Sequence, residues 1–322
     1  MAEAVAPNRR RRLFRLLRLV LIAVAVTLAV WTLAGQWRKV RGDLSELSLG
    51  WTALSAVAAL LGMACIGGAW SALLTDLGSP LPLRTGGRIF LLAQLGKYIP
   101  GSVFAIAGQM ELAKRYDVPR RRSGAASAVA IVLNTLVGGL VALAALPLLP
   151  ARLEHRLLPA LVLLPLAAVL HPRLFNVLLA RGLQLLRRPP LDQPLSGRGV
   201  LKASCWGAIS WLFLGVHVWA LCRDVGATGP VLGLAITGFA AAWIVGFVVV
   251  IAPAGLGPRE AVLVAVLGGS LAGGSGAALV VASLSRLLLL VAADVALALL
   301  SFATTSAARR PGKSIEREPG RA

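Results

Sequence analysis

The sequence predicts an all-α protein, a polytopic membrane helical bundle of about seven to eight spanning helices. Of its 322 residues, 57% are hydrophobic and only 14% are charged. Its mean hydropathy is +0.80, whereas a soluble domain is nearer half apolar and a quarter charged. Several apolar runs approach or exceed the roughly 20 residues that a helix needs to cross the hydrocarbon. Two of these runs are broken by Pro and Gly, one in each of two pseudo-repeated halves.

The formal net charge is +20, from 33 Lys and Arg against 13 Asp and Glu. A balance of this size is also found in nucleic-acid-binding proteins. Here, however, the basic residues fall in short loops between apolar spans. That distribution is typical of the positive-inside rule, in which cytoplasmic loops hold the Lys and Arg. We therefore expect the bilayer, and no nucleic acid, as a partner.

The chain divides into a basic arm at 1–15, a transmembrane domain at 16–306 and a polar tail at 307–322, which we expect to be disordered. The first span is predicted at 19–34. A signal peptide is the alternative there, but a spanning helix with its basic end inside fits an otherwise membranous chain better. Further spans are predicted at 51–74, 123–149, 157–170, 203–222, 231–251 and 277–302.

The two broken segments are predicted at 89–110 and 253–268. Proline removes a backbone donor and glycine lets the chain turn, so a plain spanning helix tolerates neither well. In a membrane such breaks survive where they are buried in protein or line a wet cavity. One broken segment in each half points to a transport site. The residues at the breaks are Lys97, Pro100 and Gly101 in the first, and Pro253, Gly255, Gly257 and Arg259 in the second.

The distribution of loop charges decides the path of 89–110. If the segment dips into the membrane and returns, most loop Lys and Arg lie on the inner side with the N-terminus. If it crosses fully, most of them lie outside, against the positive-inside rule. We therefore predict a re-entrant segment. The second break then opens to the inner side, and residues 260–268 give only about 13 Å of helix, which is too short to cross alone.

The loop at 171–202 is the longest between predicted spans. Residues 175–186 have helical periodicity, with Arg181, Arg187 and Arg188 along one edge. This pattern predicts an amphipathic helix on the inner membrane surface. A plain connecting helix is the alternative.

Ionisable residues inside spans are functional candidates, because their burial in lipid is costly. Lys97 either offers its ammonium to an anionic head group or snorkels to the interface. Glu260 either complements the dipole of the helix that it opens, or faces Lys97 or Arg286 across a cavity, or contacts a cationic head group. Arg286 lies too deep to snorkel easily, so it pairs with an acid such as Glu260 or binds an anion. Asp294 lies two turns further along the same face, too far for a direct pair with Arg286.

Asn134 lies in mid-span, where a buried amide is most often a contact between helices. The three cysteines are expected to act as small hydrophobes. The three histidines are not spaced as metal ligands with any nearby Cys or acid. The sequence contains no Ser/His/Asp set, no Walker loop and no paired Asp that would hold a metal–diphosphate. We therefore expect no metal, no cofactor and no enzyme activity.

The segments 96–102 and 253–260, together with an arginine such as Arg286 in the last span, resemble the flippase-like membrane domain of lysylphosphatidylglycerol synthases. The resemblance extends over roughly residues 13–306. It implies an inner-membrane bundle with re-entrant half-helices that moves lipids between leaflets. Relatives place an acidic residue in the span after the first motif, where this chain has Asn134. The chain shows no aminoacyl-transfer domain, so we expect no synthase activity.

These observations predict a multi-pass inner-membrane transporter with cytoplasmic termini, and a phospholipid or a polyprenyl-phosphate-linked lipid as its substrate. Two alternatives are a scaffold for a separate synthase or cell-envelope transferase, and a lipid-linked transferase. The candidate substrate-binding residues are Lys97, Pro100, Gly101, Asn134, Pro253, Gly255, Gly257, Arg259, Glu260 and Arg286.

Overall fold

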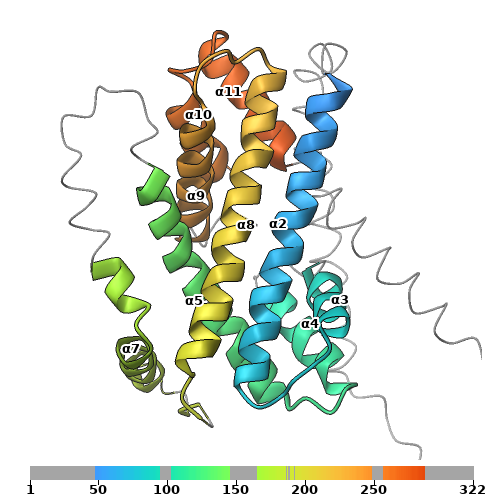
Figure 1. Cartoon of the computed structure of the whole chain (residues 1–322), viewed down its shortest axis with the longest axis vertical. Coiled ribbons are helices and arrows are strands. Elements are labelled where there is room, and N and C mark those ends of the chain that lie inside the picture. The colour runs from blue at the N-terminus through green and yellow to red at the C-terminus, as the bar shows by residue number, and fades with distance from the viewer. Residues whose placement is uncertain are drawn as a thin grey trace, which may run out of the picture.

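A computed structural model describes residues 48–94, 103–145, 165–185, 187, 189–191, 193–248 and 257–286. Every regular element in these ranges is a helix, in agreement with the predicted fold class (Figure 1). The labelled helices are α2 (Leu49–Asp76), α3 (Leu83–Gln94), α4 (Val103–Lys114), α5 (Arg120–Ala145), α7 (Pro172–Leu185), α8 (Gly197–Asp224), α9 (Leu232–Val248), α10 (Pro258–Leu267) and α11 (Gly274–Ser283). Residues 165–169, within the span predicted at 157–170, are helical as well.

The antiparallel pair α2 and α8 forms the centre of the bundle, and each helix is 28 residues long. Carboxylates tie the pair together at both ends. Asp224, which ends α8, accepts hydrogen bonds of 2.7 Å from the Ser48 N–H and 2.8 Å from the Thr52 hydroxyl. Asp76, which ends α2, accepts from the N–H and the hydroxyl of Ser196. At 1.5 Å per residue the pair is about 42 Å long, enough to cross a bilayer.

The described helices follow one pattern twice with opposite direction. A long helix, α2 or α8, is followed by a broken pair of shorter helices and then by a further helix, α5 or α11. Because α2 and α8 are antiparallel, the two broken pairs approach from opposite ends of the bundle (Figure 1). This arrangement agrees with the predicted pseudo-repeated halves and corresponds to the inverted repeats of many transporters.

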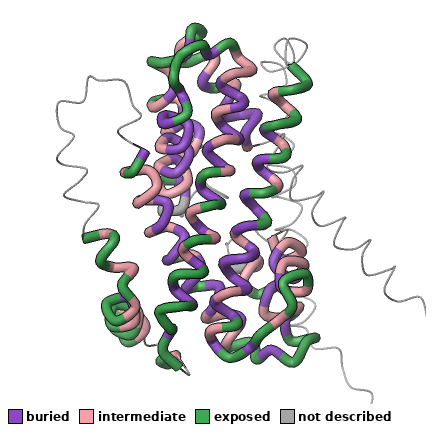
Figure 2. The backbone as a smooth tube through the Cα atoms, viewed as in Figure 1, coloured by how far each residue is buried: buried purple, intermediate pink, exposed green. Residues whose placement is uncertain are grey.

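The helices pack through two buried apolar clusters. One joins α8 to α9, α10 and α11 around Trp211, whose ring meets Trp243 edge-on at 5.5 Å between ring centroids. The other joins α2 to α3, α5 and α8 around Trp70, which is fully buried beside Phe90. Figure 2 shows these buried positions on the facing sides of the helices.

The outer faces of the long helices are apolar as well. Exposed apolar side chains recur at helical spacing on α2 (Leu54, Val57, Leu61) and on α8 (Leu201, Ile209, Leu212). A helix that is apolar on every face belongs in a core or a membrane. Three described helices, α2, α5 and α8, are long and apolar enough to span a bilayer. These faces therefore meet lipid.

The first broken segment forms a helical hairpin. A Cβ added to Gly108 of α4 would lie 3.4 Å from Ala93 of α3, so the two helices pack against each other. The chain leaves α2 and begins α5 at the same end of the bundle, because Arg122 donates a 2.9 Å hydrogen bond to the carbonyl of Gly78. The segment thus returns to the end from which it came, as predicted. Its tip, residues 95–102, lies outside the described residues.

Several helices begin earlier than the sequence predicts. The loop predicted before residue 89 contains the first half of α3, which begins at Leu83 directly after Pro82. Gly86 was expected to belong to a loop, but a Cβ there would overlap Ser71 of α2, so glycine permits the close approach of the two helices. Likewise α8 begins at Gly197, six residues before the predicted span, because Ser196 caps it by accepting a 3.0 Å bond from the Gly199 N–H.

The second broken segment consists of α9 and α10, with α11 packed against α10. The ten residues of α10 make it the half-helix that the sequence predicts. The start of α9 and the end of α10, however, both lie at the end of the bundle opposite to the first hairpin. The predicted entry of this segment from the inner side is therefore wrong, because the 17 residues of α9 are too few to reach the other end of the bundle. The backbone continues after α11 into a π-helical turn at 284–286. The first span, the tail and the remainder of the span predicted at 277–302 lie outside the described residues.

One end of the bundle is strongly basic. The described Lys and Arg beside the ends of α2, α3, α4, α5, α7 and α8 gather there, whereas Arg223 is the one basic residue described at the other end. Within the predicted loop, α7 lies beside the basic end and runs roughly perpendicular to the bundle, since Figure 1 views it nearly along its axis while α2 and α8 run vertically. We refer below to the first as the basic end and to the other, where few basic residues are described, as the sparse end.

Candidate functional site

An ion pair deep in the bundle forms the centre of the candidate site. The Arg286 Nη1 donates to Glu260 Oε1 at 2.6 Å, and the two side chains are 11% and 10% exposed. A lone charge at such a position would be costly, and pairing with a hydrogen-bonded partner offsets that cost. The structure thus brings together two of the residues that the sequence singled out.

Glu260 is held by the way in which α10 begins. Pro258 occupies the first turn, where its missing N–H costs nothing and its fixed φ suits a helix. Gly257 before it has φ +90°, a conformation that other residues rarely adopt. Glu260 Oε2 reaches back to accept a 2.7 Å hydrogen bond from the Gly257 N–H. The carboxylate therefore caps α10 with one oxygen and holds Arg286 with the other.

Arg286 approaches this carboxylate from the neighbouring chain segment. The side chains of a helix lean toward its N-terminus. Because α10 and α11 lead to and from the same turn at the sparse end, Arg286 leans toward that end while Glu260 leans away from it, so the two groups meet. Arg286 itself lies in the π-helical turn at 284–286. Such turns are rare and are frequently found at functional sites.

A histidine that sequence reasoning did not select adjoins this site. His217 of α8 is fully buried and contacts Ser285, the neighbour of Arg286, with 2.8 Å between the Nε2 and the Ser285 Oγ. The signal available in the sequence was a histidine within a predicted span. Its partners, however, come from distant segments that only the fold brings together.

Two further predicted residues lie in the described part of the chain. Arg259 precedes Glu260 in the first turn of α10 and is partly exposed. Asn134 of α5 is buried at the contact with α8, where its backbone carbonyl accepts a 2.9 Å bond from the Trp211 indole and its side-chain oxygen faces Gly207. Its described contacts are therefore those of a helix–helix contact rather than of the ion pair. Lys97, Pro100, Gly101, Pro253, Gly255 and Asp294 lie outside the described residues.

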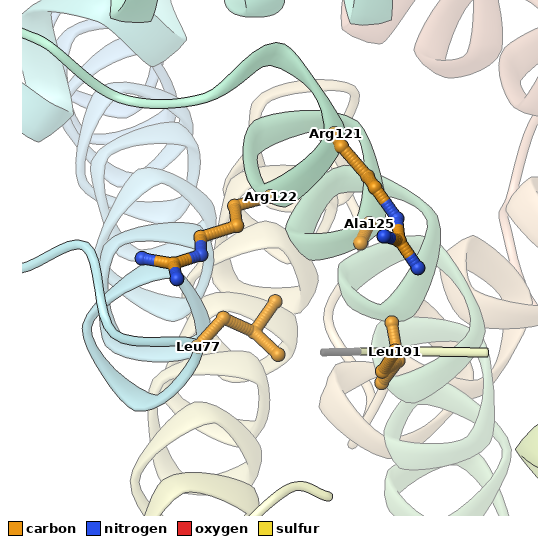
Figure 3. A pocket seen from close by; sticks show the side chains of 5 residues that line it. All are labelled: Leu77, Arg121, Arg122, Ala125 and Leu191. Atoms are coloured by element: carbon orange, nitrogen blue, oxygen red, sulfur yellow. The ribbon is translucent and has the colours of Figure 1, made fainter. Parts of the chain in front are cut away.

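A small hollow at the basic end is separate from the site around Glu260 and Arg286. It is lined by Leu77, Arg121, Arg122, Ala125 and Leu191. Figure 3 shows the two guanidinium groups well apart, that of Arg122 near Leu77 and that of Arg121 near Leu191. Arg121 donates to the carbonyl of Pro190, and Arg122 to that of Gly78. These arginines therefore connect the start of α5 to the loops that contain Pro190 and Gly78. Their side chains do not converge on a common ligand position.

Comparison with known families decides what kind of protein this is. The family model described as the lysylphosphatidylglycerol synthase TM region matches residues 15–297. The chain belongs to this family. No curated protein matched the chain.

Membership of the lysylphosphatidylglycerol synthase TM region family confirms the predicted resemblance, and the match includes both broken segments and the ion pair. Together with the apolar helices it shows a membrane protein. Among the described residues, no group of three or more His, Cys, Asp or Glu could hold a metal ion.

Proposed function

We propose that the protein is a flippase-like lipid transporter that moves an anionic or phosphate-linked head group between leaflets. The observation that carries this proposal is the buried pair of Glu260 and Arg286 beside a break in the membrane-spanning part of the chain. A buried ion pair adds little to stability compared with apolar packing of similar volume. An ion pair beside a broken helix inside a membrane bundle is instead typical of a transport path.

Exchange of partners at Arg286 provides the mechanism. The start of α10 presents backbone N–H groups and the positive end of its dipole, which together favour an anion. Glu260 occupies that position and neutralises Arg286 when no lipid is bound. A lipid phosphate takes the place of the carboxylate, and Glu260 closes the site again after the phosphate has left. The Glu260 carboxylate thus gives the positive charge of Arg286 a negative partner whenever no phosphate is bound.

The lengths of the broken helices support a path through the middle of the bundle. The 12 residues of α3 reach about 18 Å from the basic end, and the 17 residues of α9 reach about 25 Å from the sparse end. In a bundle about 42 Å long, the C-terminal ends of α3 and α9 therefore approach the same depth. We assign Lys97 to the phosphate path together with Arg286, and Pro253 and Gly255 to the segment before α10 that lines this path. Acyl chains remain in the bilayer while the head group passes.

The proposal assigns no chemical reaction to the chain and places its basic end in the cytoplasm, at the inner membrane. Its substrate is a phospholipid or a polyprenyl-phosphate-linked lipid. Direction comes from a gradient or from consumption of the product on one side, and exchange in both directions is equally allowed.

Translocation by purified protein in vesicles tests the proposal. A fluorescent anionic phospholipid is loaded into both leaflets, and a membrane-impermeant quencher is added outside. We expect quenching well beyond the outer-leaflet half, and a return to that half with Lys97→Ala or Arg286→Ala. Arg120→Ala, which removes an exposed arginine at the basic end, should translocate like the unchanged protein.

Quenching that stops at half, both for several phospholipids and for a polyprenyl-phosphate lipid, would overturn the proposal. The family member would then act as a scaffold for a separate lipid or cell-envelope enzyme. In that case changes within 171–202 would impair the partner's activity while Arg286→Ala would not.

A further inference from the structure

His217 lies where four helical segments meet in the bundle. It belongs to α8 and is 0% exposed. On one side its Nδ1 lies 2.7 Å from the Ser55 hydroxyl and 3.0 Å from the Ser55 carbonyl of α2. On the other side its Nε2 lies 2.8 Å from the hydroxyl of Ser285 in the π-helical turn. The ring of Phe239 of α9 meets the imidazole edge-on at 6.3 Å between centroids.

The hydrogen bonds assign one tautomer to this imidazole. The Ser55 hydroxyl donates to the carbonyl of His217 at 2.9 Å, so its single proton is used. The Nδ1 therefore carries the hydrogen and donates to Ser55. The Nε2 is left as an acceptor, and the Ser285 hydroxyl donates to it. One neutral imidazole thus joins α2 to the turn that follows α11.

That turn also holds the arginine of the proposed transport site, since Ser285 and Arg286 are neighbours. A π-helical turn bonds each N–H to the carbonyl five residues back rather than four, so its side chains point in other directions than those of a regular α-helix. The bond from Ser285 to His217 supplies a fixed point just before the arginine. The α2–α8 pair, held by carboxylates at both ends, provides the rigid frame to which this point is attached.

We propose that His217 is a positioning residue that acts through Ser285 to aim Arg286 at Glu260 and at the lipid phosphate. The role in lipid binding rests on the proposed function, whereas the role in aiming the ion pair does not. An apolar side chain at position 217 would fill the space without polar atoms to satisfy. A fully satisfied polar network at such a place favours one arrangement of the helices over others.

Two substitutions at His217 separate its two contacts. The amide of glutamine reaches as far as the Nε2, so His217→Gln retains a partner for Ser285. The shorter His217→Asn places its amide near the position of the Nδ1, so it retains the contact to Ser55 and loses Ser285. Both variants keep a buried amide, which makes each the control for the other.

The first readout is the coupling between Glu260 and Arg286, measured without any lipid. Thermal unfolding of the purified protein is compared for Glu260→Gln, Arg286→Gln and the double variant, in each His217 background. We expect the coupling to persist with His217→Gln and to fall sharply with His217→Asn. Ser285→Ala should lower the coupling as much as His217→Asn does. The variant with both substitutions should lower it no further than either one alone. Ser283→Ala, which removes a buried neighbouring hydroxyl, should leave the coupling intact.

The second readout is translocation of the fluorescent anionic phospholipid as a function of its content in the vesicles. Misplacement of a binding group costs up to about 100-fold. We expect His217→Asn to raise the half-saturating content on the order of tenfold, with a smaller change in the maximal rate. His217→Gln should restore the original value. Equal coupling and equal lipid dependence for the two variants would overturn the positioning role. A coupling that differs as expected, in a protein that moves no lipid, would support that role and overturn the proposed transport.

Discussion

Glu260 and Arg286 are 26 positions apart in the chain, yet they form a 2.6 Å ion pair between α10 and the turn after α11. The same carboxylate accepts a 2.7 Å bond from the Gly257 N–H. The pair therefore links a helix start to the far arm of the α10–α11 hairpin. Removing either member leaves the other as a buried charge with its main compensation lost.

The first prediction concerns this uncompensated charge. Glu260→Gln or Arg286→Gln alone should each destabilise the protein by about 3–5 kcal/mol, the usual cost of breaking a buried pair. The double variant should be less destabilised than the sum of the two, because no lone charge remains. Thermal unfolding in detergent measures the midpoints, and the four proteins form a double-mutant cycle.

The exposed pair of Glu111 and Arg120 is the control for this cycle. Its side chains are 62% and 46% exposed, and the hydrogen bond from Arg120 lowers the pKa of the Glu111 carboxyl. Water screens such a pair, so Glu111→Gln should leave the unfolding midpoint almost unchanged. Additive effects of the two buried substitutions would show that Glu260 and Arg286 do not depend on each other.

The second prediction concerns the turn that starts α10. Gly257 has φ +90°, and a Cβ there meets no atom within 4 Å, so strain rather than crowding opposes a side chain. Gly257→Ala should cost about 1–3 kcal/mol and displace the N–H that Glu260 accepts. Gly269→Ala is the control, since that glycine also has free space and no positive φ. Equal unfolding midpoints for the two variants would refute the role of the positive φ.

Much of this fold follows from patterns within short windows of sequence. Uninterrupted apolar runs identified α2, α5 and α8, because a helix that is apolar on every face has few alternatives outside a membrane. The distribution of Lys and Arg predicted that the chain returns between α2 and α5, which the bond from Arg122 to Gly78 confirms. Pro258 and Glu260 likewise marked the start of α10 within two residues.

Other features depend on contacts that no local pattern encodes. Gly86 looked like a loop residue, but its missing side chain lets α3 approach Ser71 of α2. His217 and Ser285 are 68 positions apart, and each alone resembles an ordinary buried polar residue. The sequence limited the partners of Arg286 to an acid or an anion, and only the packing of α10 against α11 identifies Glu260 as its partner in the folded chain.

The third prediction concerns the cap of α8. The Ser196 hydroxyl accepts from the Gly199 N–H and donates to Asp76, so it both starts α8 and joins it to α2. Ser196→Ala should destabilise the protein by about 1 kcal/mol, the usual cost of losing a side-chain cap. Ser48 occupies the equivalent position before α2, but its side chain makes no capping bond. Ser48→Ala should therefore leave the unfolding midpoint unchanged, and an equal shift for both serines would contradict the assigned cap.

The fourth prediction concerns α7 and the membrane surface. Phe175 is buried and Asn176 bonds to the backbone of Leu195, so α7 is fixed against the bundle. Its outer face carries exposed apolar side chains, among them Val177 and Leu178, beside Arg173 and Arg181. A helix of this kind lies at the boundary of head groups and acyl chains.

A fluorophore attached to α7 measures its depth in the bilayer. The label is placed by Leu178→Cys in a protein whose three native cysteines are replaced, and brominated lipids serve as the quencher. We expect strong quenching in anionic vesicles, because the exposed apolar face enters the interface. A label at Arg115→Cys, in the exposed turn at the same end, should be quenched little.

Arg173→Gln with Arg181→Gln should weaken quenching in anionic but not in zwitterionic vesicles, since the arginines contribute by attraction to lipid charge. Quenching at Leu178→Cys as weak as at Arg115→Cys would mean that α7 is a plain connecting helix in water.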